Sequence, residues 1–494
     1  MLTRLKVTGF KNLVDVDVHF GPFTCIAGPN GVGKSNLFDA IRFLSALADR
    51  TFMDAAKSVR DESGRTGDIR ALLHHVGERA ADGMRFEAEM IVPETGTDEL
   101  GQQASTKTTY LRYVVELGYR HDDSDPTRGS LELVEEQLER VRSGPGKPCR
   151  FPHTKEWARS VIRNSNRESP FISTEVQGRA RVVSEHQEGV QGRKRQRPAH
   201  LLPRTVLSAI NASESPTALL ARREMQSWRL LHLEPSALRR PDEFTAPPRL
   251  GSDGAHLPAT LFRLAREGGP GGDVYGMAAA RLHHLIHDIR SIRVDRDEKR
   301  ELLSLVATDR HHTQLAARAL SDGTLRFLAL TVLELDPTAV GVVCFEEPEN
   351  GIHPARIEAM LQLLQDIAVD PTVPVGSDNT LRQVIVNTHS PVVVANLPDD
   401  CLLGAVLDES VRDGERFQKL SFRALPNTWR EELSPPTPTL TLNHLQWYLQ
   451  DLGVMPVERG ESQPVNGRSR GPTHPRRVRD RPDVQSLFDV LAEA

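Results

Sequence analysis

A glycine-rich stretch near the start of the chain has the composition of a phosphate-binding loop. Residues 28–35 read GPNGVGKS and fill every fixed position of the pattern GxxxxGKS. The glycines permit a tight turn that aims backbone N–H groups at phosphate oxygens. In this pattern Lys34 supplies a positive charge to the β- and γ-phosphates, and Ser35 supplies a hydroxyl group to Mg²⁺. An apolar, strand-like run precedes the loop and an amphipathic helix pattern follows it, which predicts a nucleoside-triphosphate site.

Two adjacent acids follow a second apolar run, far along the chain. Residues 340–345 are typical of a buried strand, and Glu346 and Glu347 come directly after them. Successive side chains of a strand point to opposite faces, so both acids can serve one site only where the strand end curves. In isolation, such a pair is usually two solvated acids. The residues around the pair therefore decide between the two interpretations.

The loop and its surroundings resemble one family. Residues 9–13 (GFKNL), 28–30 (GPN) and 33–36 (GKSN) resemble the N-terminal lobe of RecF/SMC/OLD-like ABC ATPases. This resemblance implies an α/β fold, an ABC-type P-loop ATPase head with a mixed sheet, and ATP with Mg²⁺ as its ligands. It also implies that the nucleotide is bound by Asn30, Gly31, Gly33, Lys34, Ser35 and Asn36.

The C-terminal half of the resemblance includes a signature motif. Residues 320–324 (LSDGT) look like the ABC signature and precede a helix-like run at residues 325–335. In that family Ser321 and the amide of Gly323 would contact the γ-phosphate of ATP bound to the opposite protomer. Alone, the motif could simply cap a helix through Ser321 or Asp322. The resemblance implies a site that is completed only in a head-to-head homodimer or a higher homo-oligomer.

The paired acids and a downstream histidine complete the resemblance. The acids resemble a Walker B motif, and residues 348–354 (PENGIHP) continue the family's D-loop pattern. By that resemblance Glu346 holds Mg²⁺ through water, and Glu347 orients or deprotonates the attacking water. The family most often has Asp at the first of these positions, so Glu346 departs from the pattern. His389, within residues 387–391 (NTHSP), matches the switch histidine that would hydrogen-bond the γ-phosphate or the attacking water.

The two motif groups lie at opposite ends of the chain, so the fold must bring them into one sheet. We expect an N-terminal part of the head at residues 1–90, an inserted strand-rich and helical lobe at 91–310, and a C-terminal part of the head at 311–425. A short tail at 426–494 is a candidate partner or oligomer contact. Gln102, Gln103 and Gln137 remain alternatives for the family's Q-loop glutamine.

Local patterns inside these divisions predict further elements. Residues 143–203 are polar, contain the basic cluster 193–197 (RKRQR), and are predicted to be a mobile or irregular insertion. Helices are predicted at residues 216–231, 257–266 and 275–289, and in the tail at 442–452 and 484–491. The last of these has an apolar face that would either fold back onto the head or dock a partner.

Composition limits the function classes. The net charge of −5 gives no overall basic footprint for nucleic acid, and aromatic residues make up only 5% of the chain, too few for a base-stacking platform. Cys25 and Cys344 lie in strand-like runs, and the four cysteines have no metal-ligand spacing, which indicates reduced structural residues. With no membrane-spanning segment and no leader pattern, we expect a cytoplasmic protein.

The resemblance implies an ATPase in which ATP acts as a conformational switch. One hypothesis is the regulation of a separate effector nuclease or toxin in bacterial anti-phage defence, resembling the ATPase components of the Septu and PARIS systems. The alternative is a RecF-like DNA-repair or DNA-maintenance ATPase that binds duplex DNA directly. The acidic balance disfavours this alternative. The motifs look like those of the soluble group rather than of transporter subunits, and the chain after residue 398 lacks the spaced acids of an OLD-type nuclease domain.

Overall fold

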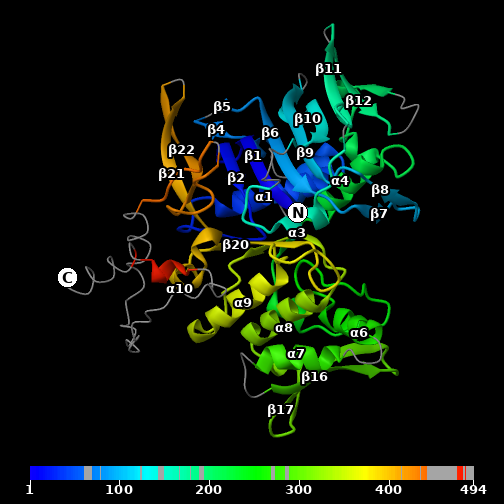
Figure 1. The fold of residues 1–494 in the computed structure, drawn as a ribbon, viewed down its shortest axis with the longest axis vertical. Coiled ribbons are helices and arrows are strands. Elements are labelled where there is room, and N and C mark those ends of the chain that lie inside the picture. Colours follow the sequence, from blue (N-terminus) through cyan, green and yellow to red (C-terminus); the bar gives the residue numbers. More distant parts are fainter. Residues whose placement is uncertain are drawn as a thin grey trace, which may run out of the picture.

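The computed structural model describes most of the chain as two large sheets with helices packed against them (Figure 1). The described residues are 1–60, 69–77, 79–122, 125–142, 149–165, 167–178, 180–188, 194–268, 273–283, 289–412, 414–433, 435–441, 476–481 and 484. Within them, no helix is long and apolar enough to cross a membrane. All four cysteines are free, and Cys25 and Cys344 are buried in strands, as predicted.

A mixed six-stranded sheet joins the two ends of the chain. In spatial order its strands are β14 (Arg229–Leu231), β19 (Gly341–Glu346), β20 (Arg382–Thr388), β3 (Phe23–Ala27), β21 (Leu402–Arg412) and β22 (Glu415–Ala424). The first five strands are parallel, and β22 is antiparallel to β21. The strands that precede the loop, the paired acids and His389 are therefore neighbours. This confirms the prediction that one sheet unites the two motif groups.

The sheet is buried on both faces, which explains why its strands are apolar runs rather than alternating patterns. On one face Ile26, Cys344 and Ile385 pack against α1 (Lys34–Leu47) and the second large sheet. On the other face, side chains such as those of Cys25 and Val386 pack against α8 (Asp322–Leu335) and α9 (Ile357–Ile367). Because side chains alternate along a strand, one short segment contributes to both cores.

The second large sheet is antiparallel and has eight strands. In spatial order these are β13 (Lys194–Pro198), β12 (Ala180–His186), β11 (Ile172–Gln177), β10 (Asp125–Arg140), β9 (Tyr110–Asp122), β6 (Gly83–Ile91), β1 (Leu2–Phe10) and β2 (Leu13–His19). Two-stranded ribbons flank the sheets: β4 (His75–Val76) with β5 (Arg79–Ala80), and β7 (Thr95–Thr97) with β8 (Gln103–Ser105).

The predicted irregular insertion at residues 143–203 is wrong for its described part. Helix α3 (Lys155–Val161) and strands β11, β12 and β13 occupy it, and the strands extend the eight-stranded sheet from β10. Only a few apolar side chains, such as Ile172 and Val183, are buried, and charged residues fill the solvent side. These strands pair with one another in chain order, so it was their polar composition that concealed them.

The basic cluster is also an ordered edge strand rather than a solvated loop. Lys194, Arg195 and Arg197 lie in β13, while Arg193 is outside the described residues. Each of the three has a carboxylate partner: Glu175 at 2.6 Å, Glu214 at 2.5 Å and Glu185 at 3.4 Å, respectively. The positive charges of this cluster are therefore locally compensated.

Two predicted helices end earlier than expected. Helix α4 is Pro216–Gln226, and residues 229–231 form β14 instead of a last helical turn. Their parallel pairing with β19 decides this, because apolar spacing over so few residues does not distinguish a helix from a strand. Helix α7 is Val274–His283, and Ile289 begins β16 (Ile289–Asp297). The predicted helix at residues 257–266 is confirmed as α6 (Leu257–Glu267).

The predicted lobe is not a separate domain that simply follows the first part of the head. Strand β9 of the predicted lobe pairs with β6, and β14 pairs with β19, so strand pairing joins the lobe to both parts of the head. A smaller sheet holds β15 (Asp242–Glu243), β16, β17 (Leu302–Asp309) and β18 (Gln314–Ala316) beside α6 and α7. The division itself remains a prediction.

The described part of the tail packs against the head. Arg476 and Arg481 both contact the carboxylate of Asp399, at 2.7 and 3.2 Å, just after helix α10 (Pro391–Asn396). Val478 and Val484 are fully buried in the core that contains α8 and α9. Intramolecular docking is therefore established for these residues. The predicted helix at 442–452 and nearly all of that at 484–491 lie outside the described residues.

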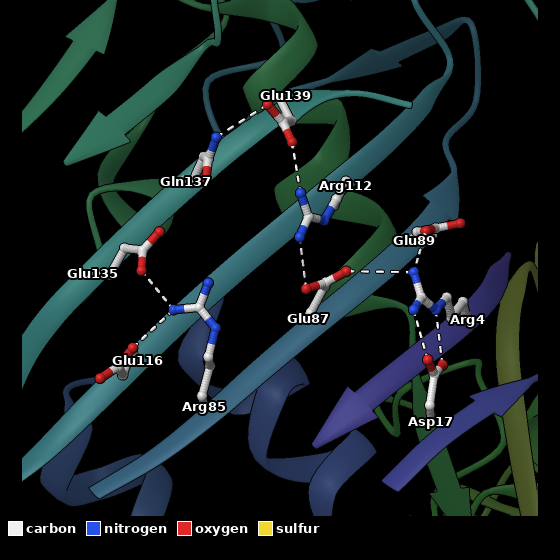
Figure 2. Close-up of polar contacts among 10 residues, drawn as sticks. All are labelled: Arg4, Asp17, Arg85, Glu87, Glu89, Arg112, Glu116, Glu135, Gln137 and Glu139. Carbon is white, nitrogen blue, oxygen red and sulfur yellow. Dashed lines mark hydrogen bonds and ion pairs between the residues drawn. The ribbon is translucent and has the colours of Figure 1, made fainter. Parts of the chain in front are cut away.

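One side of the eight-stranded sheet carries a charged network (Figure 2). Arg4 contacts Asp17 at 2.6 Å and Glu89 at 2.9 Å, and Arg112 contacts Glu87 at 2.7 Å and Glu139 at 2.9 Å. Burial raises the pKa of Glu87, but hydrogen bonding to Arg112 and the charges of Arg112 and Arg4 outweigh it, so the net pKa is lowered. Glu87 therefore remains ionised, and the arginines on this side are already paired.

Candidate nucleotide-binding site

The loop at residues 28–33 folds as its glycines predict. Gly31 and Gly33 have φ values of +83° and +96°, and α1 begins immediately afterwards, with Gly33 as its N-cap. A Cβ atom at Gly33 would lie 2.2 Å from the Asn12 side-chain nitrogen. That side chain donates to the carbonyl oxygen of Val32 at 2.9 Å and accepts from Asn36 at 2.7 Å. Asn12 thus braces the loop, a role that its position in the GFKNL run did not reveal.

Lys34 is held inside this loop. Its Nζ donates to the carbonyl oxygens of Gly28 at 2.7 Å and Pro29 at 2.8 Å, and the residue is only 6% exposed. Burial lowers the pKa of Lys34, and the negative charges of Glu347 and Glu349 partly oppose this effect. The ammonium group therefore lies near the strand-end acids, with weak carbonyl partners that phosphate oxygens could replace.

The chain bends sharply between the two paired acids. Strand β19 ends at Glu346, and Glu347 has a φ of +45°, which is uncommon for a residue other than glycine. The backbone N–H of Glu347 is fixed by Asn387, whose Oδ1 and carbonyl oxygen accept from it at 3.0 and 3.1 Å. The strand end therefore has the local curvature that two adjacent acids require in order to face one site.

The Glu347 carboxylate is held from two sides. Its Oε1 lies 2.7 Å from Nδ1 of His389, and its Oε2 accepts from the Asn350 side chain at 2.9 Å. Burial raises the pKa of Glu347, but hydrogen bonds from Asn350 and His389 and the charge of Lys34 outweigh it and lower the pKa. The group is therefore an oriented, ionised carboxylate that is 29% exposed and can still accept a proton.

Further residues in the site were not predicted. Asn387 also approaches Glu346 at 3.4 Å, and the buried Glu349 accepts a hydrogen bond from the Thr388 hydroxyl. Burial raises the pKa of Glu349. Glu349 and Asn350 belong to the PENGIHP run, and Asn387 and Thr388 flank His389. Their motifs were recognised, but their contacts depend on the pairing of β19 with β20.

The signature residues lie at the start of α8. Ser321 is the N-cap, and its Oγ accepts from the backbone N–H of Thr324 at 3.2 Å. A Cβ at Gly323 would lie 2.7 Å from the carbonyl oxygen of Gly351, so the signature packs closely against the D-loop. Among the described residues, no hydrogen bond or ion pair joins Ser321 or Gly323 to Lys34 or Glu347. The structure thus groups Lys34 with Glu346, Glu347 and His389, while the signature packs against the D-loop beside them.

The remaining predicted residues differ in how closely they are placed. Asn30, Gly31 and Ser35 are exposed at the loop and at the first turn of α1. Gln137 donates to Glu139 on the charged side of the eight-stranded sheet (Figure 2). Gln103 lies in β8. Neither hydrogen-bonds the site acids within the described chain. The Q-loop assignment remains open.

The residues fit a nucleotide with Mg²⁺. Gly31 has no atom within 4 Å of a built Cβ, so its backbone is open to a ligand. No cluster of three protein ligands for a metal exists among the described residues. Mg²⁺ commonly retains water and phosphate oxygens and needs few protein groups. Ser35 and Glu346 are the residues that would hold it.

Two family descriptions match the chain. Residues 167–395 match a family described as "AAA domain, putative AbiEii toxin, Type IV TA system", and residues 1–61 match the RecF/RecN/SMC N-terminal domain. The DNA replication and repair protein RecF of Phocaeicola vulgatus is 35% identical over 63 residues, covering 13% of this chain and 17% of that protein. The OLD nuclease of Thermus scotoductus is 51% identical over 41 residues, covering 8% of each chain.

A solved SMC head, bound to the C-winged helix domain of ScpA, overlaps 86% of this chain and 98% of its own chain. It is 14% identical, with a TM-score of 0.43. The strand order and loop geometry define an ABC-type P-loop ATPase head. The two family matches and the RecF and OLD relatives make parts of this chain similar to the RecF/SMC/OLD-like group. The chain spans less than a fifth of the length of the RecF and OLD relatives above.

Proposed function

We propose that this chain binds and hydrolyses ATP with Mg²⁺ and uses the nucleotide as a conformational switch. The observation that carries the proposal is the Glu347 carboxylate, held between His389 and Asn350 at a bent strand end near Lys34. A fixed, ionised carboxylate beside a phosphate-binding loop suits proton abstraction from an attacking water.

Each residue group has a separate task in this scheme. Lys34 exchanges the carbonyl oxygens of Gly28 and Pro29 for the β- and γ-phosphates, and the α1 N-terminus and loop amides bind the same anion. Mg²⁺, when bound, neutralises charge on the phosphates, with Ser35 and Glu346 as its protein contacts. Glu347 accepts the proton of the attacking water, and His389 hydrogen-bonds both Glu347 and the reacting group.

The proposed active unit is a head-to-head homodimer or a higher homo-oligomer. Within the described residues, no hydrogen bond or ion pair joins Ser321 or Gly323 to Lys34 of the same copy, and Ser321 is exposed at the start of a 14-residue helix. An exposed helix N-terminus can bind the γ-phosphate of a nucleotide held by a second copy. Each composite site would then use Lys34 of one copy and Ser321 of the other.

A mixing experiment tests the composite site. Lys34→Ala and Ser321→Arg should each abolish steady-state ATP hydrolysis when assayed alone. In a mixed dimer, the unaltered Lys34 of one copy meets the unaltered Ser321 of the other, so one of the two sites is intact. Mixing the inactive proteins should therefore restore phosphate release, to at most about half the wild-type rate per dimer.

A double variant that carries both substitutions in one chain provides the control. Its mixture with either single variant cannot assemble an intact site and should remain inactive. A mixture of the two single variants that stays inactive, although light scattering shows mixed dimers, would contradict the composite site.

The downstream role proposed here is control of a separate effector nuclease or toxin in bacterial anti-phage defence, in the cytoplasm. Support comes from the match of residues 167–395 to a family whose description names a toxin of a type IV TA system. The tail region at residues 426–494 is a candidate contact for that effector. The similarity to several DNA replication and repair proteins RecF also favours a second candidate.

The second candidate is direct binding of duplex DNA. Two described surfaces oppose it: the basic residues of β13 are paired with carboxylates, and Arg4, Arg85 and Arg112 on the charged side each contact at least two acids (Figure 2). Fluorescence anisotropy with a labelled duplex separates the candidates. We expect no binding tighter than about 10⁻⁵ M at 150 mM salt, within the range of non-specific contacts. Submicromolar binding with a steep salt dependence would favour the RecF-like function instead.

A further inference from the structure

A small cavity lies at one end of the strands of the six-stranded sheet, and the nucleotide loops lie at the other end. Its volume is about 200 Å³, and it is formed where β14 and β19 begin, beside the loop after α8. Its lining includes Arg229, Arg249, Asp336, Thr338 and Val340. The strands are parallel, so the loops that follow β3 and β19 lie at the C-terminal ends of the strands, away from the cavity. The cavity is therefore separate from the candidate nucleotide site.

Two guanidinium groups in this cavity have no partner. Neither the Arg229 nor the Arg249 side chain makes a hydrogen bond or ion pair with the described residues. Arg249 is exposed, whereas Arg229 is partly buried. Burial lowers the pKa of Arg229, and the nearby charge of Arg249 lowers it further, although Asp336 acts in the opposite direction. The two groups are close enough to repel each other.

The acid in the lining, Asp336, attracts Arg229 through its charge but makes its hydrogen bonds with other groups. Asp336 accepts from Arg263 at 2.6 Å, and from the backbone N–H and hydroxyl of Thr338 at 2.9 and 2.7 Å. The buried Arg382 lies nearby and donates to the carbonyl oxygens of Leu333 and Glu334. The hydroxyls of Ser227 and Thr260 donate to backbone carbonyls. The free donors of the cavity are therefore the two unpaired guanidinium groups.

An unpaired, partly desolvated charge is costly unless a counter-ion joins it. Guanidinium groups match the planar, multidentate acceptors of oxyanions and are the preferred protein donors for phosphate. A volume of about 200 Å³ equals several water molecules at roughly 30 Å³ each, and is below the usual size of a pocket for a whole organic ligand. The cavity therefore suits a single phosphate-sized anion rather than a nucleotide.

We propose that this cavity is a second anion site, which binds a phosphate group between Arg229 and Arg249. The group can be free inorganic phosphate or the phosphate of a small monoester, and both present the same tetrahedral oxyanion. The site does not require ATP hydrolysis, so it stands or falls independently of the function proposed above.

The test uses the full chain with Lys34→Ala, which removes the main phosphate-binding charge of the nucleotide loop. Isothermal titration with inorganic phosphate and, separately, with glycerol 3-phosphate measures what remains. We expect saturable binding of one or both, weakened about tenfold or more by Arg229→Gln and likewise by Arg249→Gln, since each removes a charged hydrogen-bond donor. Arg240→Gln, which removes an exposed arginine outside the cavity lining, is the matched control and should leave the affinity unchanged.

The outcomes separate the sources of the anion. Binding of inorganic phosphate supports a free-ion site, and binding of glycerol 3-phosphate alone supports a monoester site. Two results would overturn the proposal. One is the absence of phosphate binding in the Lys34→Ala protein, and the other is an equal affinity in the Arg229→Gln, Arg249→Gln and Arg240→Gln variants. Arg249 is exposed, so its substitution keeps the test valid even where Arg229→Gln fails to fold by circular dichroism.

Discussion

Replacing Lys34 with alanine is expected to reduce ATP affinity by a factor of about 100 to 10,000. Lys34 is the cation enclosed by the loop, where its two hydrogen bonds to backbone carbonyls hold it ready for phosphate. A charged hydrogen bond contributes about 1.5–3 kcal/mol, so the loss of two such contacts costs roughly 3–6 kcal/mol. Isothermal titration calorimetry with ATP and Mg²⁺ measures the change.

The fold should survive this substitution, because it removes a buried charge whose pKa is already lowered by burial. Lys57→Ala is a suitable control, since Lys57 is exposed on α2 (Phe52–Arg60). Its ATP affinity should equal that of the wild type. Equal affinity in the Lys34→Ala protein would refute the assignment of residues 28–35 as the phosphate-binding loop.

Glu347→Gln is expected to separate nucleotide binding from turnover. Glutamine keeps the size of the side chain and can still pair with Asn350, but it cannot accept a proton from water. General-base catalysis contributes about 10²- to 10⁴-fold, so the steady-state hydrolysis rate should fall by that factor while ATP still binds. The bound, unhydrolysed nucleotide should hold two heads together, which would appear as a doubled mass in light scattering.

Two variants make this result specific. Glu168→Gln changes an exposed glutamate away from the site and should hydrolyse ATP at the wild-type rate. Glu346→Gln should weaken the dependence on Mg²⁺ rather than remove the base. Normal hydrolysis by Glu347→Gln would place the base elsewhere, with Glu346 as the next candidate.

Local patterns predicted the elements that carry the candidate site better than the strands around them. The loop at residues 28–35, the strand before it and the strand before Glu346 were recognisable because their spacing is local and every position is constrained. Strands β11 to β13 were missed because their sequences are mostly polar and few of their side chains are buried. Strand β14 was missed for a different reason, since its three residues adopt a strand beside β19, which is distant in sequence.

The contacts of the catalytic candidates show a second limit. The sequence indicated that the strand end must curve, but not that Asn387 would fix the Glu347 backbone or that Asn350 would hold its carboxylate. The contact of Asn387 joins two strand ends that meet only after the sheet has formed. Asn350 lies three residues after Glu347 in the same turn, so its contact is local, but the motif does not show which way its side chain points. The brace between Asn12 and Val32 is also a contact between distant segments, since it connects the β1–β2 turn to the loop.

The left-handed backbone at Glu347 has a consequence for laboratory evolution of this protein. A glutamate at a φ of +45° carries local strain of order 1–3 kcal/mol, which glycine or asparagine would largely relieve. A screen that rewards heat resistance alone would therefore enrich substitutions at position 347. Under the role proposed for this residue, the selected variants would be more thermostable and would bind ATP without hydrolysing it. Thermostability and turnover pull in opposite directions at this one position, so a stabilised version of the protein has to be sought with position 347 held constant.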